Sequence, residues 1–360
     1  MPLFMDIHVV EDEAFDQIAA MKGHHKDIAV QSKFGVTSLK YFLNLSEKKV
    51  FCLLDAPNKQ ACEAVHMAAH GIGACNVIEL SSEIDFKVFL GEGAKDENDM
   101  ALTLTGDIDT GYRSIIMICP IFFEDIKAHV LDKLYSLIET CGGKRIVLPE
   151  DSILVSFVSA SKSITAVKSI RDYLNTFTCN LEYTLALVTG KPVDENGKVL
   201  FEETKKALVA LNDLSKIRIV QIDNITIGLA GKSEKNQEKI GNDVRRLSSA
   251  HLAFCTKLWT ILNQEISNTN FTSVHLSSQL GLSKAQTYRK IKALTEMAPN
   301  QLIREMRLRR SLSALKKNNK NVAEIAYELG FNSPTYFTRV FRKRFDILPT
   351  QFAKLSNTHF

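Results

Sequence analysis

The first 82 residues alternate between two patterns of hydrophobic and polar positions. Strand-like runs, in which apolar side chains recur with a period of two, occur at residues 3–10, 37–45, 48–57 and 76–80. Helix-like stretches occupy residues 14–35 and 58–71. The order strand, helix, strand, strand, helix, strand predicts a ferredoxin-like α/β domain over residues 1–82. The polar, glycine-punctuated residues 83–112 are expected to form a linker with little core of its own.

Residues 113–230 repeat this kind of alternation. The expected elements are a strand at 113–123, a helix at 124–143, a short strand pair within 144–159, a helix at 161–177, a strand at 181–190, a helix at 200–215 and a strand at 218–223. This order predicts a second α/β domain, also of ferredoxin-like type. The polar residues 231–250 are expected to link it to the C-terminal region.

Residues 251–360 contain an imperfect internal repeat. The segment LSSQLGLSKAQTYRKIKALTEMAPNQL is echoed by IAYELGFNSPTYFTRVFRKRFDILPTQF, so that Leu280–Gly281 corresponds to Leu329–Gly330. Each copy has the order helix, glycine-containing turn, helix. The pattern predicts an all-α domain with two helix-turn-helix units.

Capping residues define the second helix of each unit. Ser283 can cap a helix, and Gln286 three residues later completes a capping box. In the second copy Ser333 is the cap, and the locked φ of Pro334 suits the first helical position. These signals predict helices at Lys284–Thr295 and Pro334–Phe345.

Each predicted helix has one apolar face and one polar face. The apolar stripes suit a core, and consist of Thr287, Ile291 and Leu294 in the first helix and Phe337, Val340 and Phe341 in the second. The candidate DNA-contacting residues are Ser283, Lys284, Ala285, Tyr288, Arg289, Lys292, Ser333, Thr335, Thr338, Arg339, Arg342 and Lys343. Arginine can bind guanine through two hydrogen bonds, threonine and alanine can contact the thymine methyl group, and lysine supplies charge for phosphates. A connecting helix within 301–317 could place both units in successive major grooves, about 34 Å apart.

The charge distribution agrees with a polyanionic partner. Residues 251–360 contain 17 Lys and Arg against 6 Asp and Glu, whereas the rest of the chain contains 28 against 35. A basic C-terminal third on an acidic body is typical of nucleic-acid binding. The seven cysteines are scattered without a CxxC pair, and no apolar stretch reaches the length of a membrane span. The expected location is therefore cytoplasmic, with no membrane partner.

The repeat also carries a family resemblance. Residues 256–355, and above all AEIAYELGFNSPTYFTRVFRKRFDILPTQF, resemble the DNA-binding domain of AraC/XylS-type bacterial regulators. The resemblance implies a transcription regulator that binds double-stranded DNA and acts with the transcription machinery. The chain departs from the family pattern at Glu296 and Asp346, where the family usually has glycine after the helix. Aspartate tolerates a left-handed backbone better than glutamate does.

The N-terminal domain contains a concentration of histidines. His66 and His70 are four residues apart on one predicted helix, so both imidazoles can face the same ligand. Nickel, zinc and copper accept imidazole ligands readily, but exposed or hydrogen-bonded histidines would have the same spacing.

A second resemblance adds to this pattern. HKDIAVQSKFG and KVFCLLDAPNKQACEAVHMAAHG are similar to a small ferredoxin-like domain family associated with nickel binding, over about residues 3–80. The resemblance implies His25, His66 and His70 as the metal ligands. A dimerisation module is the alternative role for this domain.

The middle domain resembles a nucleotide cyclase homology domain in its order of elements and in ALVTGKPVDENGKVLFEETKKALVAL. Cyclases hold two metal ions with two carboxylates. Here the first position is Cys119, and the second is Asp151 without the glycine that normally follows. The resemblance therefore implies a degenerate cyclase fold, kept for sensing or dimerisation, and not an enzyme.

Together these patterns predict a homodimeric, DNA-binding transcription regulator whose N-terminal domains sense a small effector or a metal ion such as nickel. The interpretation requires no cofactor, and activation and repression remain alternatives. Two rival hypotheses are a nucleotide cyclase-like enzyme and a metal storage or delivery protein with an accessory DNA-binding domain.

Overall fold

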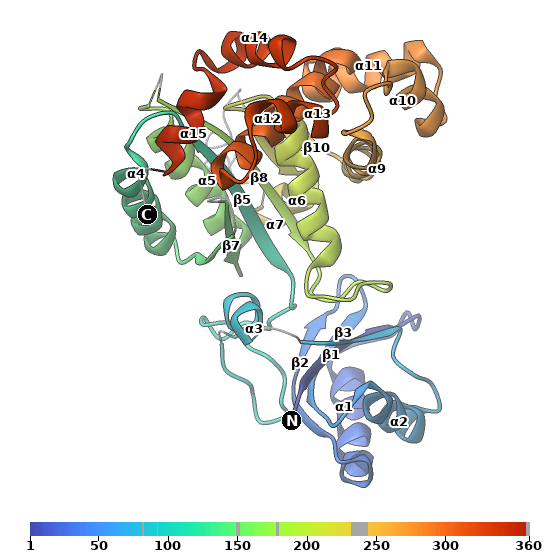
Figure 1. The fold of residues 1–360 in the computed structure, drawn as a ribbon. Coiled ribbons are helices and arrows are strands. Elements are labelled where there is room, and N and C mark those ends of the chain that lie inside the picture. Colours follow the sequence, from blue (N-terminus) through green and yellow to red (C-terminus); the bar gives the residue numbers. More distant parts are fainter. Residues whose placement is uncertain (81–82, 92, 149–151, 178–179, 232–243, 358–360) are drawn as a thin grey trace.

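The computed structural model describes residues 1–80, 83–91, 93–148, 152–177, 180–231 and 244–357. An N-terminal α/β domain lies at one end of the molecule, a larger α/β domain lies in the middle, and the C-terminal helices cover the opposite end (Figure 1). The predicted fold class, two α/β domains followed by an all-α region, is confirmed.

The N-terminal domain is a four-stranded antiparallel sheet with two helices. Its elements are β1 (Leu3–Val9), α1 (Gln17–Gln31), the short 3₁₀ helix η1 (Ser32–Phe34), β2 (Thr37–Asn44), β3 (Lys49–Asp55), α2 (Lys59–His70) and β4 (Asn76–Glu79). The strand order β2-β3-β1-β4 is that of a ferredoxin-like sandwich. The side chains of Asp16 and Asn58 cap the N-termini of α1 and α2, and both residue types are favoured at this position.

The segment that follows is more than the linker that its polar sequence predicted. It contains α3 (Glu83–Phe89), and Phe89, Leu90 and Ala101 are buried. The N–H of Ala101 donates to the carbonyl of Tyr41 at 2.7 Å, which joins the segment to the edge strand β2. Its few apolar residues pack against cores that other elements supply, and a pattern confined to the segment could not reveal that.

The middle domain is built on a six-stranded sheet. Its elements are β5 (Arg113–Phe122), α4 (Lys127–Thr140), β6 (Lys144–Val147), β7 (Ile153–Phe157), α5 (Ala160–Leu174), β8 (Leu181–Gly190), α6 (Glu202–Leu214), β9 (Val220–Asp223), α7 (Asn224–Leu229) and β10 (Val244–Leu247). In the order β10-β9-β8-β5-β7-β6, the last four strands repeat the ferredoxin-like arrangement. β9 and β10 extend it in parallel, so the expected linker 231–250 contributes an edge strand at its end.

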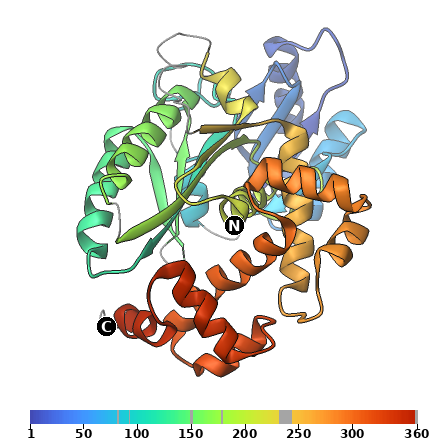
Figure 2. The same cartoon turned by 90° about the horizontal axis from the view of Figure 1, so that it is seen from above.

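All regular secondary structure in the described part of the C-terminal region, residues 249–357, is helical. Its elements are α9 (Ser249–Glu265), α10 (Ser273–Leu280), α11 (Lys284–Thr295), α12 (Pro299–Lys317), α13 (Val322–Glu328), α14 (Pro334–Phe345) and α15 (Pro349–Asn357). α10 with α11, and α13 with α14, form the two helix-turn-helix units, which α12 connects (Figure 2). No helix in the described ranges is both long and apolar enough to cross a membrane.

Candidate nucleic-acid interface and metal cluster

The second helix of each unit, α11 or α14, is its candidate recognition helix. The first recognition helix, α11, begins and ends at the predicted residues. The N–H of Gln286 donates to Ser283 Oγ at 3.2 Å, and the N–H of Ser283 donates to Gln286 Oε1 at 3.0 Å, which completes the capping box. Gly281 closes the preceding helix in the left-handed conformation, with φ of 70°. Thr287 and Ile291 are buried, so the predicted core face is confirmed.

The second recognition helix, α14, follows the same local rules. Ser333 caps it through the N–H of Tyr336, Pro334 is its first residue, and Phe337 and Phe341 are fully buried. Both recognition helices end on a non-glycine residue with positive φ, 61° at Glu296 and 57° at Asp346. These are the helix-end positions where the sequence departs from the family pattern.

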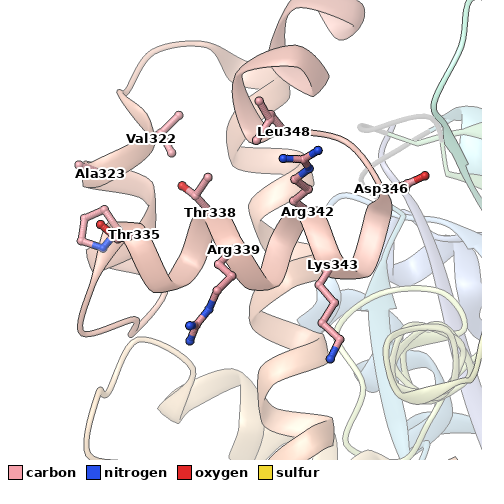
Figure 3. Close-up of a pocket in the computed structure, with 10 residues that line it drawn as sticks. Val322, Ala323, Thr335, Thr338, Arg339, Arg342, Lys343, Asp346 and Leu348 are labelled. Atoms are coloured by element: carbon pink, nitrogen blue, oxygen red, sulfur yellow. The ribbon is translucent and has the colours of Figure 1, made fainter.

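The candidate DNA-contacting residues share one exposed surface on each helix. Ser283, Lys284, Ala285, Tyr288, Arg289 and Lys292 are exposed on or beside α11, and on α14 Thr335, Arg339, Arg342 and Lys343 are exposed while Ser333 and Thr338 are half-buried. The α14 side chains line a hollow of about 830 Å³ beside the start of α13 (Figure 3). The guanidinium of Arg339 lies 5.3 Å from the ring centre of Tyr336, which restrains it before any ligand arrives. Contact of these residues with DNA stays a prediction.

The sides of these helices that face the middle domain carry ion pairs that the sequence did not predict. Arg344 of α14 pairs with Glu182 of β8, and Glu296 at the end of α11 pairs with Lys216 and Arg245. The partners are up to 162 residues apart, so no local pattern relates them. The sequence offered one indication of these ion pairs: Glu296 occupies a helix-end position where glycine would adopt the left-handed backbone at lower cost.

His66 and His70 meet at a buried carboxylate in the N-terminal domain. Nδ1 of His66 lies 3.2 Å and Nε2 of His70 lies 3.0 Å from Oδ1 of Asp27. Asp27, His66 and His70 could each offer one ligand atom to a metal ion, with these atoms within 4.8 Å of one another. His25, the third residue expected at this site, is exposed and lies outside the group. Asp27 takes its place, and its location inside the quoted HKDIAV string was the signal for it.

One carboxylate and two imidazoles are ligands that transition metals accept. However, His66 already contacts two carboxylates. Its Nε2 lies 2.7 Å from Oδ2 of the fully buried Asp6, opposite Asp27. Burial alone would lower the pKa of His66, but the hydrogen bonds and charges of Asp27 and Asp6 raise this pKa to about 10. An imidazolium that donates from both nitrogens has no lone pair for a metal. A metal ion at this group would therefore have to replace one of these contacts.

The cyclase-like positions do not form a carboxylate pair among the described residues. Cys119 lies on β5 with the hydroxyl of Ser152 donating to its Sγ at 3.5 Å, and burial raises the pKa of its thiol to about 11. Asp151 lies outside the described residues. The resemblance of the middle domain to cyclases stays a prediction.

A cavity of about 800 Å³ opens where all three regions meet. Its walls come from the β2–β3 turn, the end of β8, α6 and α9. The lining mixes apolar residues, including Leu252 and Ile261, with polar and charged residues, including Thr256 and Lys206. Small-molecule sites have this size and this mixture of surfaces.

Comparisons with known proteins match both ends of the chain. A family described as "Helix-turn-helix domain" matches residues 276–355, and one described as "Nickel responsive protein SCO4226-like" matches residues 4–80. The histidine kinase P4 of Formosa agariphila is 36% identical over 29% of this chain and 8% of its own length. The HTH-type transcriptional activator RhaR of Mannheimia succiniciproducens is 29% identical over 42% of this chain and 50% of its own.

A solved structure of SCO4226 from Streptomyces coelicolor A3(2) is 23% identical over 22% of this chain and 98% of its own, with a TM-score of 0.21. The chain spans half or less of the two curated relatives named above. At the level of its parts, residues 4–80 are similar to the SCO4226-like family, and residues 276–355 are similar to helix-turn-helix domains of the AraC type.

Proposed function

We propose that this chain is a sequence-specific, DNA-binding transcription regulator in which α11 and α14 enter successive major grooves. The observation that carries the proposal is the pair of exposed polar and basic faces, each on a helix whose opposite face is buried. Helices of this kind present side chains to base edges while the unit rests on the phosphate backbone. We further propose that the protein acts in the cytoplasm as a homodimer, which would double the number of recognition helices on the DNA. The bound dimer would then contact the transcription machinery.

Selection of bound duplexes from a random DNA pool tests this function. We expect a defined site whose binding weakens as salt rises, because phosphate contacts release counterions. Arg339→Ala should relax the preference at one or two base pairs. Retention of every duplex with equal affinity, or of none, would overturn the proposal. Incubation with ATP or GTP and Mn²⁺ should yield no cyclic product, which separates the regulator from the cyclase hypothesis.

We further propose that the N-terminal domain responds to a metal ion at Asp27, His66 and His70. The support is the convergence of one carboxylate and two imidazoles at the end of α2, together with the match to a family described as nickel responsive. His70 is the accessible member, since 22% of its side chain is exposed, whereas His66 is fully buried. A metal ion would therefore approach from the His70 side.

Titration calorimetry with Ni²⁺ and Zn²⁺ tests the metal site. His70→Gln should abolish binding and leave the fold intact, because this side chain is partly exposed. His25→Gln is the matched control, since His25 lies on the neighbouring helix outside the group, and it should bind like the unmodified protein. Equal loss in both variants, or no heat from the unmodified protein, would remove the metal from the proposal. Binding without any effect on DNA selection would instead favour metal storage.

The cavity between the three regions is the second place proposed for an effector. Thr256 and Ile261 of its wall belong to α9, which packs on α10 of the first unit, so a ligand there would act directly on the DNA-binding region. A thermal-shift screen of small organic acids should find compounds that raise Tm. The Ala253→Trp variant, which places a large side chain in the cavity, should weaken or lose that response. A response that survives in this variant would place the ligand elsewhere.

A further inference from the structure

Each recognition helix is tied at its C-terminal end to the middle domain. Glu296 directly follows α11 as its C-cap, and Arg344 lies in the last turn of α14. Both side chains form ion pairs with residues of the six-stranded sheet or its loops. Neither residue belongs to the exposed face expected to meet DNA. The two contacts are independent, because they use different helices, opposite charges and different strands.

The ion pairs of the first unit explain why a glutamate occupies a backbone position that favours glycine. Glu296 has φ of 61°, a left-handed conformation that is unfavourable for a non-glycine residue. Its carboxylate accepts from Lys216 Nζ at 2.7 Å and from Arg245 at 2.8 Å, and Arg245 also donates to the carbonyl of Leu294. Lys216 follows α6, and Arg245 is in β10. A glycine would relieve the strain and lose both contacts.

In the second unit, Arg344 forms a bidentate ion pair with Glu182. The guanidinium of Arg344 donates to both oxygens of Glu182 at 2.8 and 2.9 Å, while its Nε donates to Glu305 of α12 at 2.9 Å. All three side chains are at most about a quarter exposed. Partly buried pairs of this geometry add little net stability, but they define orientation because both groups are planar.

The connecting helix is attached to the same part of the middle domain. Arg309 of α12 donates to the carbonyls of Asn212, Asp213 and Ser215 at the end of α6. Trp259 of α9 donates to Asp213 Oδ2 at 2.6 Å. Four C-terminal helices thus contact the middle domain through polar side chains.

We propose that the middle domain sets the separation and relative rotation of α11 and α14, with Glu296 and Arg344 as positioning residues. The proposal rests on the DNA-binding function above. Two pre-positioned helices accept two subsites at one spacing, because each added base pair rotates the second subsite by about 35° and moves it by about 3.4 Å. Units joined only by a flexible connection would tolerate several spacings. The middle domain is therefore a determinant of which DNA this chain recognises.

A series of duplexes with one or two base pairs inserted or deleted between the two subsites tests the proposal. We expect the unmodified protein to lose about tenfold or more in affinity when the spacing changes by one pair, because its helices are preorganised. Glu182→Gln and Glu296→Gly should each reduce this penalty to about threefold or less. Asp346→Gly is the matched control: Asp346 has the same position and φ in the second unit, but no ion pair of its side chain is present among the described residues.

Glu296→Gly separates positioning from simple stabilisation. Removal of the left-handed glutamate should leave Tm unchanged or raised, while the spacing penalty falls. A lower Tm with an unchanged spacing penalty would show that the contacts are only structural and would overturn the proposal.

The distance between α11 and α14 can also be measured in the absence of DNA, which tests the same proposal. Spin labels on noncanonical residues at the exposed positions Ala285 and Thr335 should report one narrow distance in the unmodified protein. The Glu182→Gln and Glu296→Gly variants should each give a broad distribution of distances. Identical distributions would overturn the proposal even if DNA binding is confirmed. Absence of any specific DNA site, with a narrow distance, would instead refute the DNA-binding function.

Discussion

The two helix-turn-helix units have the same local fold but are held in different ways. Buried residues of the first unit, including Leu276, Leu280 and Ile291, belong to one continuous apolar core that also includes residues of α6 and of both sheets. The second unit has a core of its own, in which Phe337 and Phe341 of α14 are fully buried. Among the described hydrophobic residues of the middle domain, Ile121 and Phe123 pack against that core. The first unit is an extension of the body, whereas the second is an attached module.

One pair of equivalent positions shows the difference. Leu294 in α11 and Arg344 in α14 have the same place in their helices, 50 residues apart. Leu294 packs against the shared core, whereas Arg344 pairs with Glu182. The same side of each helix therefore faces the middle domain, through apolar contact in one unit and through charge in the other.

Truncation of one core residue in each unit should have the largest effect. Phe337→Ala should remove about 3–5 kcal/mol and Ile291→Ala about 2–5 kcal/mol of local stability. Because the second core is separate and includes Leu308, Leu312 and Leu315 of α12, Phe337→Ala should produce an early unfolding transition confined to the second half of α12 and the residues after it. Ile291→Ala should lower the main transition. Denaturation followed by hydrogen exchange distinguishes these results. A single shifted transition in both variants would show that the two units unfold as one body.

The equivalent arginines of the recognition faces should differ less. Arg339→Ala should cost about 1–3 kcal/mol of binding free energy and relax one base preference, if it reads a base. Arg289→Ala should cost less, because no aromatic partner restrains Arg289 among the described residues, whereas Arg339 lies over Tyr336. Affinities for the selected duplex and its single-base variants measure both effects. A larger loss from Arg289→Ala would assign the main specificity to the first unit.

Local signals predicted the recognition helices to the residue, and long-range contacts explain what they missed. Ser283 and Ser333 act within three residues of their own positions, so a short sequence window contains the whole interaction. The pairing of Arg344 with Glu182 depends instead on how β8 and α14 meet in space. The same reason applies to the metal cluster: Asp27 of α1 contacts His66 of α2, while the predicted ligand His25 is exposed and lies outside the group.

Loss of the helix caps should have a smaller and more equal effect. Ser283→Ala and Ser333→Ala each remove the acceptor of one N–H at a helix start, worth about 1 kcal/mol. Ser333→Ala should be the milder change, because Pro334 restricts the first turn whether or not the cap is present. Thermal unfolding of both variants tests this order. Equal losses would mean that the proline adds nothing to the start of α14.

The smallest expected difference concerns phosphate contacts. Lys343→Ala should weaken binding to all duplexes alike and reduce the slope of log affinity against log salt by about 1. Lys292→Ala should change the slope less, because the Lys292 ammonium group already donates to the carbonyl of Glu296 at the end of its own helix. To reach a phosphate, Lys292 must give up that contact, whereas no partner of Lys343 is present among the described side chains. Titrations between 50 and about 200 mM salt resolve a slope change of this size. Equal changes in both variants would show that the contact with Glu296 is exchanged for phosphate without cost, and the two units would then differ in their attachment to the body but not in their contact with the DNA backbone.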